Sequence, residues 1–110
     1  MDENCVFCKI VKGEIPAKKV YEDEEIVVLD DIKPKAPIHY LIIPTKHIES
    51  FDALQDLAIW ERMADTAQRL IVAENLTEKG YRLVVNGGLA ALIGHLHMHL
   101  LGDIGPEDDH

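Results

Sequence analysis

The pattern of apolar and polar positions is most distinctive at residues 95–101, where histidines alternate with apolar residues. In a β-strand, successive side chains point to opposite faces of the sheet. The alternation therefore predicts a strand that buries its apolar members in a core and aligns its histidines on the opposite face. The apolar members are Leu96, Met98 and Leu100, and the histidines are His95, His97 and His99.

A second pattern, with apolar residues three and four positions apart, runs from about residue 56 to residue 73. Charged residues and glutamine lie between them, so the spacing predicts an amphipathic helix with one apolar side. Ser50 or Asp52 is expected to cap a short turn before this helix. The apolar positions are Leu57, Trp60, Met63, Ala64, Ala67, Leu70 and Ile71.

Shorter apolar segments predict four further strands, at residues 19–22, 25–29, 39–44 and 81–85, of which the first two form a hairpin. Residues 5–12 predict a short N-terminal helix, which Gly13 and Pro16 end. Together the elements predict an α+β fold, with a five-stranded antiparallel sheet, one long helix and the short N-terminal helix. The long helix is expected to cover one sheet face, the histidines to lie on the other, and the acidic tail from residue 103 to be irregular.

Length and composition indicate a single globular domain over residues 1–110, with 47% hydrophobic and 28% charged residues. The net charge of -9 argues against nucleic acid and against an anionic membrane surface as partners, because both are negatively charged. No apolar run approaches the roughly 20 residues of a membrane span. The N-terminus also has no apolar signal region, so we expect a cytoplasmic protein.

Three imidazoles on one sheet face serve no packing purpose. A neutral imidazole can act as a nucleophile, as a general acid or base near pH 7, or as a metal ligand. The histidine face is therefore the predicted place of the protein's chemistry. His39, at the start of another predicted strand, is expected to be a hydrogen-bonded structural residue.

Cys5 and Cys8 form a Cys-x-x-Cys pair, which occurs in redox dithiols and in zinc sites and also arises by chance. They are too close in sequence for a disulfide to stabilise the fold usefully. A redox dithiol normally follows a strand, and none is predicted before Cys5. A zinc site would need two further ligands.

Residues 95–101 match the pattern His-φ-His-φ-His-φ-φ, in which φ is apolar, at every position. Together with other segments in the same order, they resemble the histidine triad family of nucleotide-binding hydrolases and transferases, most closely its Hint-like branch. The similarity spans residues 5–102. The other segments are Cys5-x-x-Cys8-Lys-Ile, Gly13-Glu14-Ile15-Pro16-Ala17, Asp31-Ile32-x-Pro34, Ala36-Pro37-x-His39, Ile43-Pro44-x-Lys46-His47 and Gly80-Tyr81-Arg82-Leu83-Val84-Val85-Asn86.

The resemblance implies a hydrolase that cleaves purine nucleoside phosphoramidates or related adenylates at the α-phosphate. His97, the middle histidine, would attack phosphorus and form a nucleotidyl-histidine intermediate that water then hydrolyses. His99 would donate to a phosphate oxygen in the transition state. Asn86 would lie beside the phosphate, and Asp31 would hold the ribose hydroxyls. The residues implied to form an apolar slot for the base are Val6, Phe7, Ile10, Leu29 and Ile32.

The resemblance also implies a metal site. His47 and His95 are similar to the residues that complete a Cys2His2 zinc site in family members that have the cysteine pair. With Cys5 and Cys8 they would hold a structural zinc ion that fixes the N-terminal segment to the sheet.

The family pairs two chains through the long helix and the strand that follows it, which implies a homodimer here. Residues 81–85 predict an edge strand in which Arg82 is the only charge, and a free edge of this kind invites pairing. Trp60 and Met63 also give the helix more apolar surface than one small sheet face needs. A two-fold interface would cover both features.

One segment departs from the family. Residues 87–94 are two residues shorter than the usual loop and lack its Gln-Ser or Gln-Thr pair, whose hydroxyl helps the leaving group. The backbone amide of Gly88, or one near Ile93, would still bind phosphate. The tail also lacks a Trp-Pro-Pro segment. Two alternatives therefore stay open: a dinucleoside-polyphosphate hydrolase or nucleotidyltransferase, and a weakly catalytic nucleotide-binding interaction protein.

Overall fold

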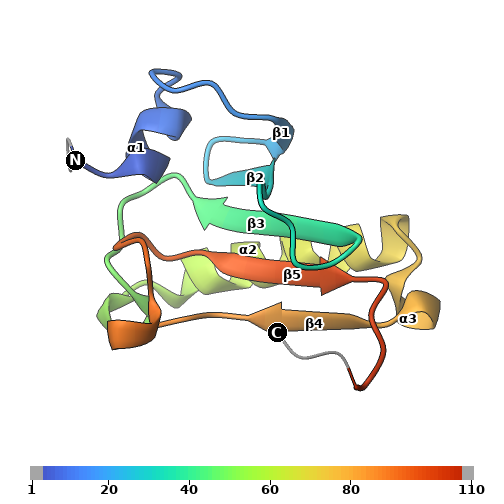
Figure 1. Cartoon of the computed structure of the whole chain (residues 1–110). Helices are drawn as coiled ribbons and strands as arrows, with labels where there is room; N and C mark the ends of the chain where they lie inside the picture. The colour runs from blue at the N-terminus through green and yellow to red at the C-terminus, as the bar shows by residue number, and fades with distance from the viewer. Residues whose placement is uncertain (1–3, 108–110) are drawn as a thin grey trace.

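The structure is a computed structural model that describes residues 4–107. Its five strands form one antiparallel sheet in the order β1-β2-β3-β5-β4, as Figure 1 shows. The predicted α+β fold is confirmed. In chain order the elements are α1 (Val6–Val11), β1 (Lys19–Glu22), β2 (Ile26–Asp30), β3 (Ile38–Pro44), η1 (Phe51–Ala53), α2 (Leu57–Ala73), α3 (Leu76–Lys79), β4 (Tyr81–Val84), η2 (Gly88–Ala90) and β5 (Met98–Gly102).

The sheet separates two hydrophobic cores, one on each face. The first lies between the sheet and α2, which runs along the back of the sheet in Figure 1. It contains Met98 and Leu100 of β5 as well as Leu96 just before that strand, so all three apolar members of the alternation are buried as predicted. The second core lies under α1 and includes Phe7 and Leu41. The histidines therefore lie on the face that α1 covers.

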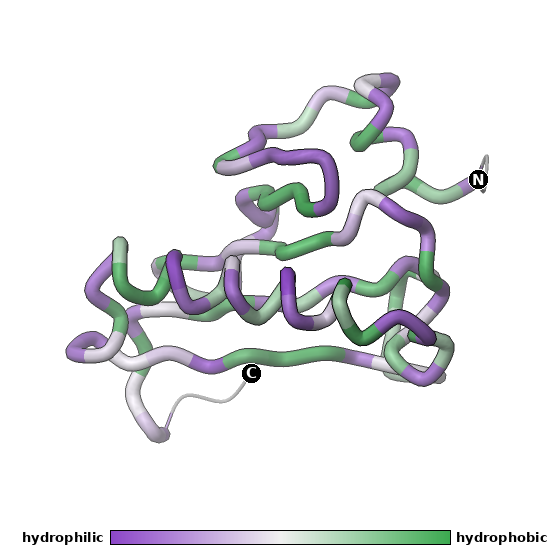
Figure 2. The backbone as a smooth tube through the Cα atoms, turned by 180° about the vertical axis from the view of Figure 1, so that it is seen from behind, coloured by the Kyte–Doolittle hydropathy of each residue, from purple (hydrophilic) through white to green (hydrophobic). Residues whose placement is uncertain are grey.

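α2 begins at its predicted position because Asp56 caps it, with a side-chain oxygen that accepts a hydrogen bond from the Ala58 N–H at 3.0 Å. Figure 2 shows hydrophilic and hydrophobic stretches succeeding one another within the turns of the helix, as expected for a helix with one apolar side. Thr66 is the one polar member of its buried side. Its hydroxyl donates to the Arg62 carbonyl at 2.8 Å, which satisfies the group without disturbing the core.

The chain turns from α2 into β4 through residues with positive φ. Asn75 has φ 57° and precedes the short helix α3, which the sequence did not predict because four residues are too few to show a helical period. Gly80 has φ 91°, and a Cβ there would lie 1.9 Å from the Ile104 carbonyl oxygen. Only glycine fits this position, so it fixes where β4 starts.

The predicted histidine strand was wrong at its start, since β5 begins at Met98 and contains only His99 of the three histidines. The N–H of Leu96 donates to the carbonyl oxygen of Ile48 at 2.7 Å and not to a carbonyl of a neighbouring strand. β3 cannot extend the ladder further in that direction because it ends at Pro44, which has no N–H. The alternation of faces nevertheless continues through residues 95–97, since Leu96 lies in the core under α2.

Two smaller predictions were also wrong. Met63 is fully buried in the first core and adds nothing to the exposed surface of α2. Ser50 precedes η1 but makes no capping hydrogen bond with its side chain, and Asp52 lies inside that turn. The predicted tail runs beyond the described residues at 108–110. In the part of the chain that the structure describes, no helix is long and apolar enough to cross a membrane.

Candidate active site and metal centre

His97 has its ring fixed by the backbone two residues before it. Its Nδ1 lies 2.8 Å from the His95 carbonyl oxygen, which can only accept, so Nδ1 carries the proton. In the neutral ring, Nε2 then has a free lone pair. The side chain is 8% exposed and lines a cavity of about 300 Å³. The geometry thus presents an unprotonated ring nitrogen, which is what a nucleophilic histidine needs.

The cavity brings together five of the site residues predicted from the sequence: Phe7, Asp31, Asn86, His97 and His99. Phe7 belongs to α1, and its ring lies edge-on to that of His97 with the centroids 5.1 Å apart. Asp31 follows β2 and Asn86 follows β4, so the segments beyond two strands meet the histidine segment here. A cavity of this size with convergent polar groups and one aromatic wall suits a small organic ligand.

The remaining residues predicted to contact the nucleotide do not line this cavity. Ile10 and Leu29 are buried in the core under α1, and Val6 packs against that core. Ile32 is 92% exposed. Gly88 borders a different concavity, beside Phe51 and Trp60. The apolar slot for the base therefore stays a prediction, with Phe7 as the member that reaches the cavity.

The cavity also contains residues that were not predicted to line it: Lys33, Lys35, His39, Leu41, Ala90 and Leu92. Ile93, near which a phosphate-binding amide was predicted, lines it as well. His39 is buried and hydrogen-bonded, as predicted, and it also lies on the cavity side of the sheet. The register pairs Leu41 with His99, and residues 39 and 41 share a face, so strand pairing would have revealed it. That pairing cannot be read from one strand alone.

His99 is hydrogen-bonded to His39, whose Nε2 lies 2.9 Å from Nδ1 of His99. Burial, followed by the neighbouring charges of His97 and His39, lowers the pKa of His99 to about 4, although Asp31 opposes the shift. His99 is therefore neutral at pH 7.

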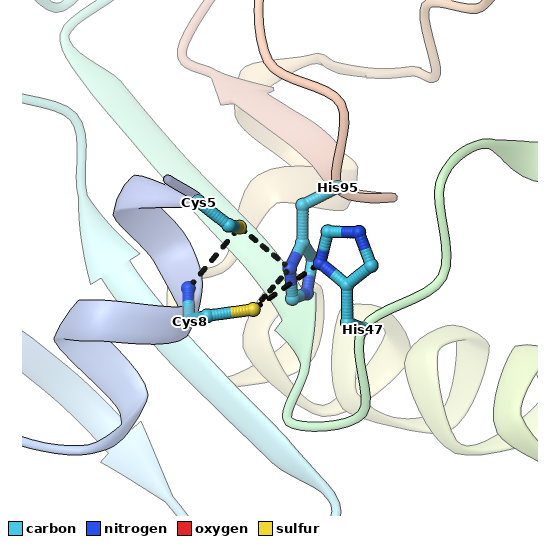
Figure 3. Close-up of side chains that lie close together, drawn as sticks. All are labelled: Cys5, Cys8, His47 and His95. Atoms are coloured by element: carbon cyan, nitrogen blue, oxygen red, sulfur yellow. Dashed lines mark hydrogen bonds between the residues drawn. The ribbon is translucent and has the colours of Figure 1, made fainter. Parts of the chain in front are cut away.

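Cys5, Cys8, His47 and His95 converge as predicted, and Figure 3 shows their side chains pointing toward one another. The cysteines come from the start of α1, His47 from the loop after β3, and His95 from the segment before β5. Nδ1 of His95 lies 3.2 Å from Cys5 Sγ and 3.5 Å from Cys8 Sγ, and Nδ1 of His47 lies 3.2 Å from Cys8 Sγ. All four ligand atoms lie within 4.8 Å of one another.

These residues fit a tetrahedral zinc ion. Bonds of about 2.3 Å to sulfur and about 2.0 Å to nitrogen place tetrahedral sulfur and nitrogen ligands roughly 3.5 Å apart, close to the observed separations. The other ring nitrogens find acceptors, since Nε2 of His95 lies 2.9 Å from the Pro44 carbonyl and Nε2 of His47 lies 3.3 Å from a Glu49 carboxylate oxygen. Both Nδ1 atoms are thereby left unprotonated toward the sulfurs, as metal ligation requires.

The surroundings of the cluster favour the ligand forms of its members. Burial is the main cause that lowers the pKa of His95, so its ring stays neutral. The N–H of Cys8 donates to Cys5 Sγ at 3.3 Å, which caps α1 and would stabilise a thiolate. The two sulfurs are not joined in a disulfide.

His95 connects the cluster with the cavity. Its ring belongs to the four-residue cluster, and its carbonyl oxygen holds Nδ1 of His97. Phe7, between the two cysteines in sequence, contacts the rings of both His95 and His97, with centroids 5.8 Å and 5.1 Å apart. Whatever fixes the cluster therefore also fixes the ring of His97.

Another concavity, of about 450 Å³, lies between β1 and α2. Its arginines already have carboxylate partners: Arg62 lies 3.4 Å from Glu25 and 3.7 Å from Asp23, and Arg69 lies 2.9 Å from Asp65. No histidine or cysteine lines it among the residues that the structure describes. We therefore place the chemistry in the histidine cavity.

Comparison with known proteins defines the class to which this site and fold belong. The family model described as "Scavenger mRNA decapping enzyme C-term binding" matches residues 4–107. An uncharacterized HIT-like protein of Methanocaldococcus jannaschii is 39% identical over 99 residues, which cover 88% of this chain and 77% of that protein.

Solved structures agree. A HIT family hydrolase from Legionella pneumophila Philadelphia 1 has a TM-score of 0.89 and 44% identity, with 93% of this chain and 95% of that chain covered. A Zn-bound histidine triad family protein from Mycobacterium smegmatis has a TM-score of 0.79 and 31% identity, with 94% and 78% covered. The chain belongs to the histidine triad (HIT) family and has the nucleotide-binding fold of HIT family hydrolases.

Proposed function

We propose that the protein hydrolyses purine nucleoside phosphoramidates or related adenylates at the α-phosphate, through a nucleotidyl intermediate on His97. The observation that carries this proposal is the hydrogen bond of 2.8 Å from Nδ1 of His97 to the His95 carbonyl, which leaves Nε2 as a nucleophile beside the cavity. No other described histidine that lines the cavity has its Nδ1 proton held by a backbone carbonyl in this way.

The reaction would proceed in two steps. Nε2 of His97 forms a bond to phosphorus as the bond to the leaving amine breaks, and the amine departs with the electron pair and takes a proton from solvent. A water molecule then attacks phosphorus and releases a proton to solvent, and the electron pair of the bond between phosphorus and His97 returns to Nε2. His99 would donate to a phosphate oxygen, Asn86 would lie beside the phosphate, and Asp31 would accept from the ribose hydroxyls.

We propose further that Cys5, Cys8, His47 and His95 hold a structural zinc ion. Support comes from the sulfur-to-nitrogen separations of 3.2–3.5 Å and from the acceptors on both outer ring nitrogens. The relative from Mycobacterium smegmatis is described as Zn-bound. When bound, the metal would join α1 to the histidine segment, and it has no part in the phosphoryl chemistry.

A trapping experiment tests the hydrolase function. The protein is incubated with an adenosine 5′-phosphoramidate, quenched, and analysed by mass spectrometry. We expect an AMP adduct on the peptide that contains His97 and none on the His97→Ala variant. An adduct on another residue, or turnover of the variant, would contradict the mechanism.

A specific observation favours the second candidate, a dinucleoside-polyphosphate hydrolase or nucleotidyltransferase. Lys33 and Lys35 line the cavity of a chain whose net charge is -9, and they would suit additional phosphates. Steady-state rates with diadenosine polyphosphates and with AMP-amine substrates separate the two functions. Higher kcat/KM for the polyphosphates would favour this candidate.

The third candidate, a weakly catalytic nucleotide-binding interaction protein, draws on the loop before the histidines. Leu89 and Leu92 are almost fully exposed, and no hydroxyl side chain lies in residues 87–94. AMP binding without any turnover would favour this candidate.

We also propose a homodimer formed through α2 and β4. β4 lies at one edge of the sheet, with Tyr81 and Leu83 47% and 44% exposed, and Trp60 is half-buried on α2. Pairing β4 with its copy would cover this edge. A monomer mass by light scattering at micromolar concentration would contradict the proposal.

A further inference from the structure

His39 has both ring nitrogens within hydrogen-bond distance of other groups. The backbone N–H of Lys35 lies 3.0 Å from Nδ1. A backbone amide can only donate, so Nδ1 accepts this hydrogen bond and carries no proton. In the neutral ring, the single proton of His39 is therefore on Nε2.

Two acceptors surround that proton. Nδ1 of His99 lies 2.9 Å from Nε2 of His39, and an oxygen of the Asp31 carboxylate lies 3.4 Å from it. An ionised carboxylate cannot donate, so it favours the same position of the proton. Because Nδ1 of His99 accepts from His39, the proton of neutral His99 is on its own Nε2.

We propose that His39 is a positioning residue that holds His99 as an Nε2–H donor for the reacting phosphate, in a hydrogen-bond chain that begins at the Lys35 amide. His39 is buried at 4% exposure, whereas His99 and Asp31 are partly exposed, so the chain runs from a fixed backbone group to the cavity. The donor role toward phosphate rests on the proposed function. The assignment of the tautomers does not, because it follows from the hydrogen bonds alone.

A metal ion among Asp31, His39 and His99 is the alternative, since their ligand atoms lie within 4.8 Å of one another. Ligation through Nε2 of His39 would require that atom to be unprotonated, which moves the proton to Nδ1. Nδ1–H and the Lys35 N–H would then face each other as two donors across 3.0 Å. The hydrogen-bond chain satisfies all these groups, and a metal ion would leave the amide without an acceptor.

This hydrogen-bond chain supplies a hydrogen bond to the phosphate but does not transfer a proton to it. If His99 released its Nε2 proton, its Nδ1 would have to take the proton of His39. The Lys35 amide cannot replace that proton, because a backbone N–H does not ionise near pH 7. His99 therefore stabilises negative charge on the phosphate while it keeps its own proton.

Nitrogen-15 spectra of the full chain, labelled at histidine and prepared with its metal, report which ring nitrogen carries each proton. We expect His39 and His99 as Nε2–H tautomers and His97, as an internal control, as the Nδ1–H tautomer. A wild-type His99 with its proton on Nδ1, or with a mixture of both tautomers, would overturn the proposal.

Two variants separate positioning from packing. His39→Gln can accept from the Lys35 amide and donate to His99, whereas His39→Leu fills the buried space and does neither. We expect His39→Leu to give mixed His99 tautomers and to lower kcat for an adenosine 5′-phosphoramidate about tenfold, with less than about a twofold change in KM. We expect His39→Gln to restore most of both properties.

An unchanged His99 tautomer in His39→Leu, or equal losses in both variants, would overturn the positioning role. A wild-type protein without turnover would contradict the proposed function alone. The spectra would still decide the tautomers in that case.

Discussion

Two compact groups of side chains flank His97, the proposed nucleophile, and each has ligand atoms within 4.8 Å of one another: Cys5, Cys8, His47 and His95 in the first, and Asp31, His39 and His99 in the second. In the first group, both histidines turn Nδ1 toward the sulfurs and direct Nε2 at an outer acceptor. In the second, the Lys35 amide occupies Nδ1 of His39, so a proton lies inside the group.

The outer partner of each ring therefore decides what the group can do. Where that partner is an acceptor, the inner nitrogen is free to bind a metal ion; where it is a donor, the inner nitrogen holds a proton. His97 lies between the groups. On one side its Nδ1 is hydrogen-bonded to the His95 carbonyl, and on the other its ring centroid lies 5.0 Å from that of His99. In the proposed mechanism, the first group positions the nucleophile His97, and the second positions the donor His99.

Removing His97 should have the largest effect on catalysis, because the first group positions this side chain and the second lies next to it. We expect His97→Ala to lower kcat/KM for an adenosine 5′-phosphoramidate at least about a thousandfold. AMP affinity should stay within about a factor of ten, since one imidazole is a small part of the ligand's contacts. Steady-state kinetics and calorimetric titration with AMP measure the two quantities.

Val72→Ala is a matched control for this variant, since Val72 is 78% exposed on α2, away from the cavity. Its kinetics should equal those of the wild type. Turnover by His97→Ala at more than a tenth of the wild-type rate would exclude His97 as the nucleophile.

Removing the thiolates should abolish metal binding. We expect Cys5→Ser combined with Cys8→Ser to lose the single zinc ion per chain and to lower the melting temperature by on the order of 10 °C. Elemental analysis and thermal unfolding measure these effects. Asp31→Asn is the control from the second group and should keep one zinc ion per chain. Two metal ions per wild-type chain would contradict the contrast between the groups.

Removing the metal from the wild-type protein should also slow the reaction, because His95 and Phe7 join the cluster to His97. We expect a chelator to lower kcat roughly tenfold, with recovery when zinc is added back. The metal-free protein should also lose the single Nδ1–H tautomer of His97. If kcat and the tautomer are both unchanged, the metal cluster and the nucleophile are not coupled.

The smallest effect concerns acid stability. Burial lowers the pKa of His99 to about 4, so the native state binds this proton less readily than the unfolded state, whose pKa is near 6.5. This contribution to stability is present above pH 6.5 and is lost as the pH falls toward 4. An NMR titration of His99 with a midpoint near 6.5 in the native state would contradict the assignment.

Much of this arrangement could be predicted from sequence, because alternation and helical spacing are local properties. Leu96, Met98 and Leu100 were assigned to the core from their alternation alone, and Leu57 to Ile71 were assigned to one helix by period. The grouping of Cys5, Cys8, His47 and His95 came from the family resemblance and not from spacing, and the structure brings the four side chains together.

Other features depend on contacts between distant segments. β5 starts at Met98 because Ile48 takes the Leu96 amide, and nothing near residue 96 signals that partner. His39 reaches the cavity because β3 pairs with β5 in a register that sequence alone does not give. Ile32, matched by motif to a base slot, is exposed because its side chain faces away from both cores.

The contrast between the two groups is tested most directly by anomalous X-ray diffraction at the zinc edge from crystals of the purified chain. The geometry predicts one strong peak among Cys5, Cys8, His47 and His95, at about 2.3 Å from each sulfur. It predicts no peak between His39 and His99, whose nitrogens should stay about 2.9 Å apart as a hydrogen-bonded pair. A peak between those two rings, or none at the cysteines, would contradict the account.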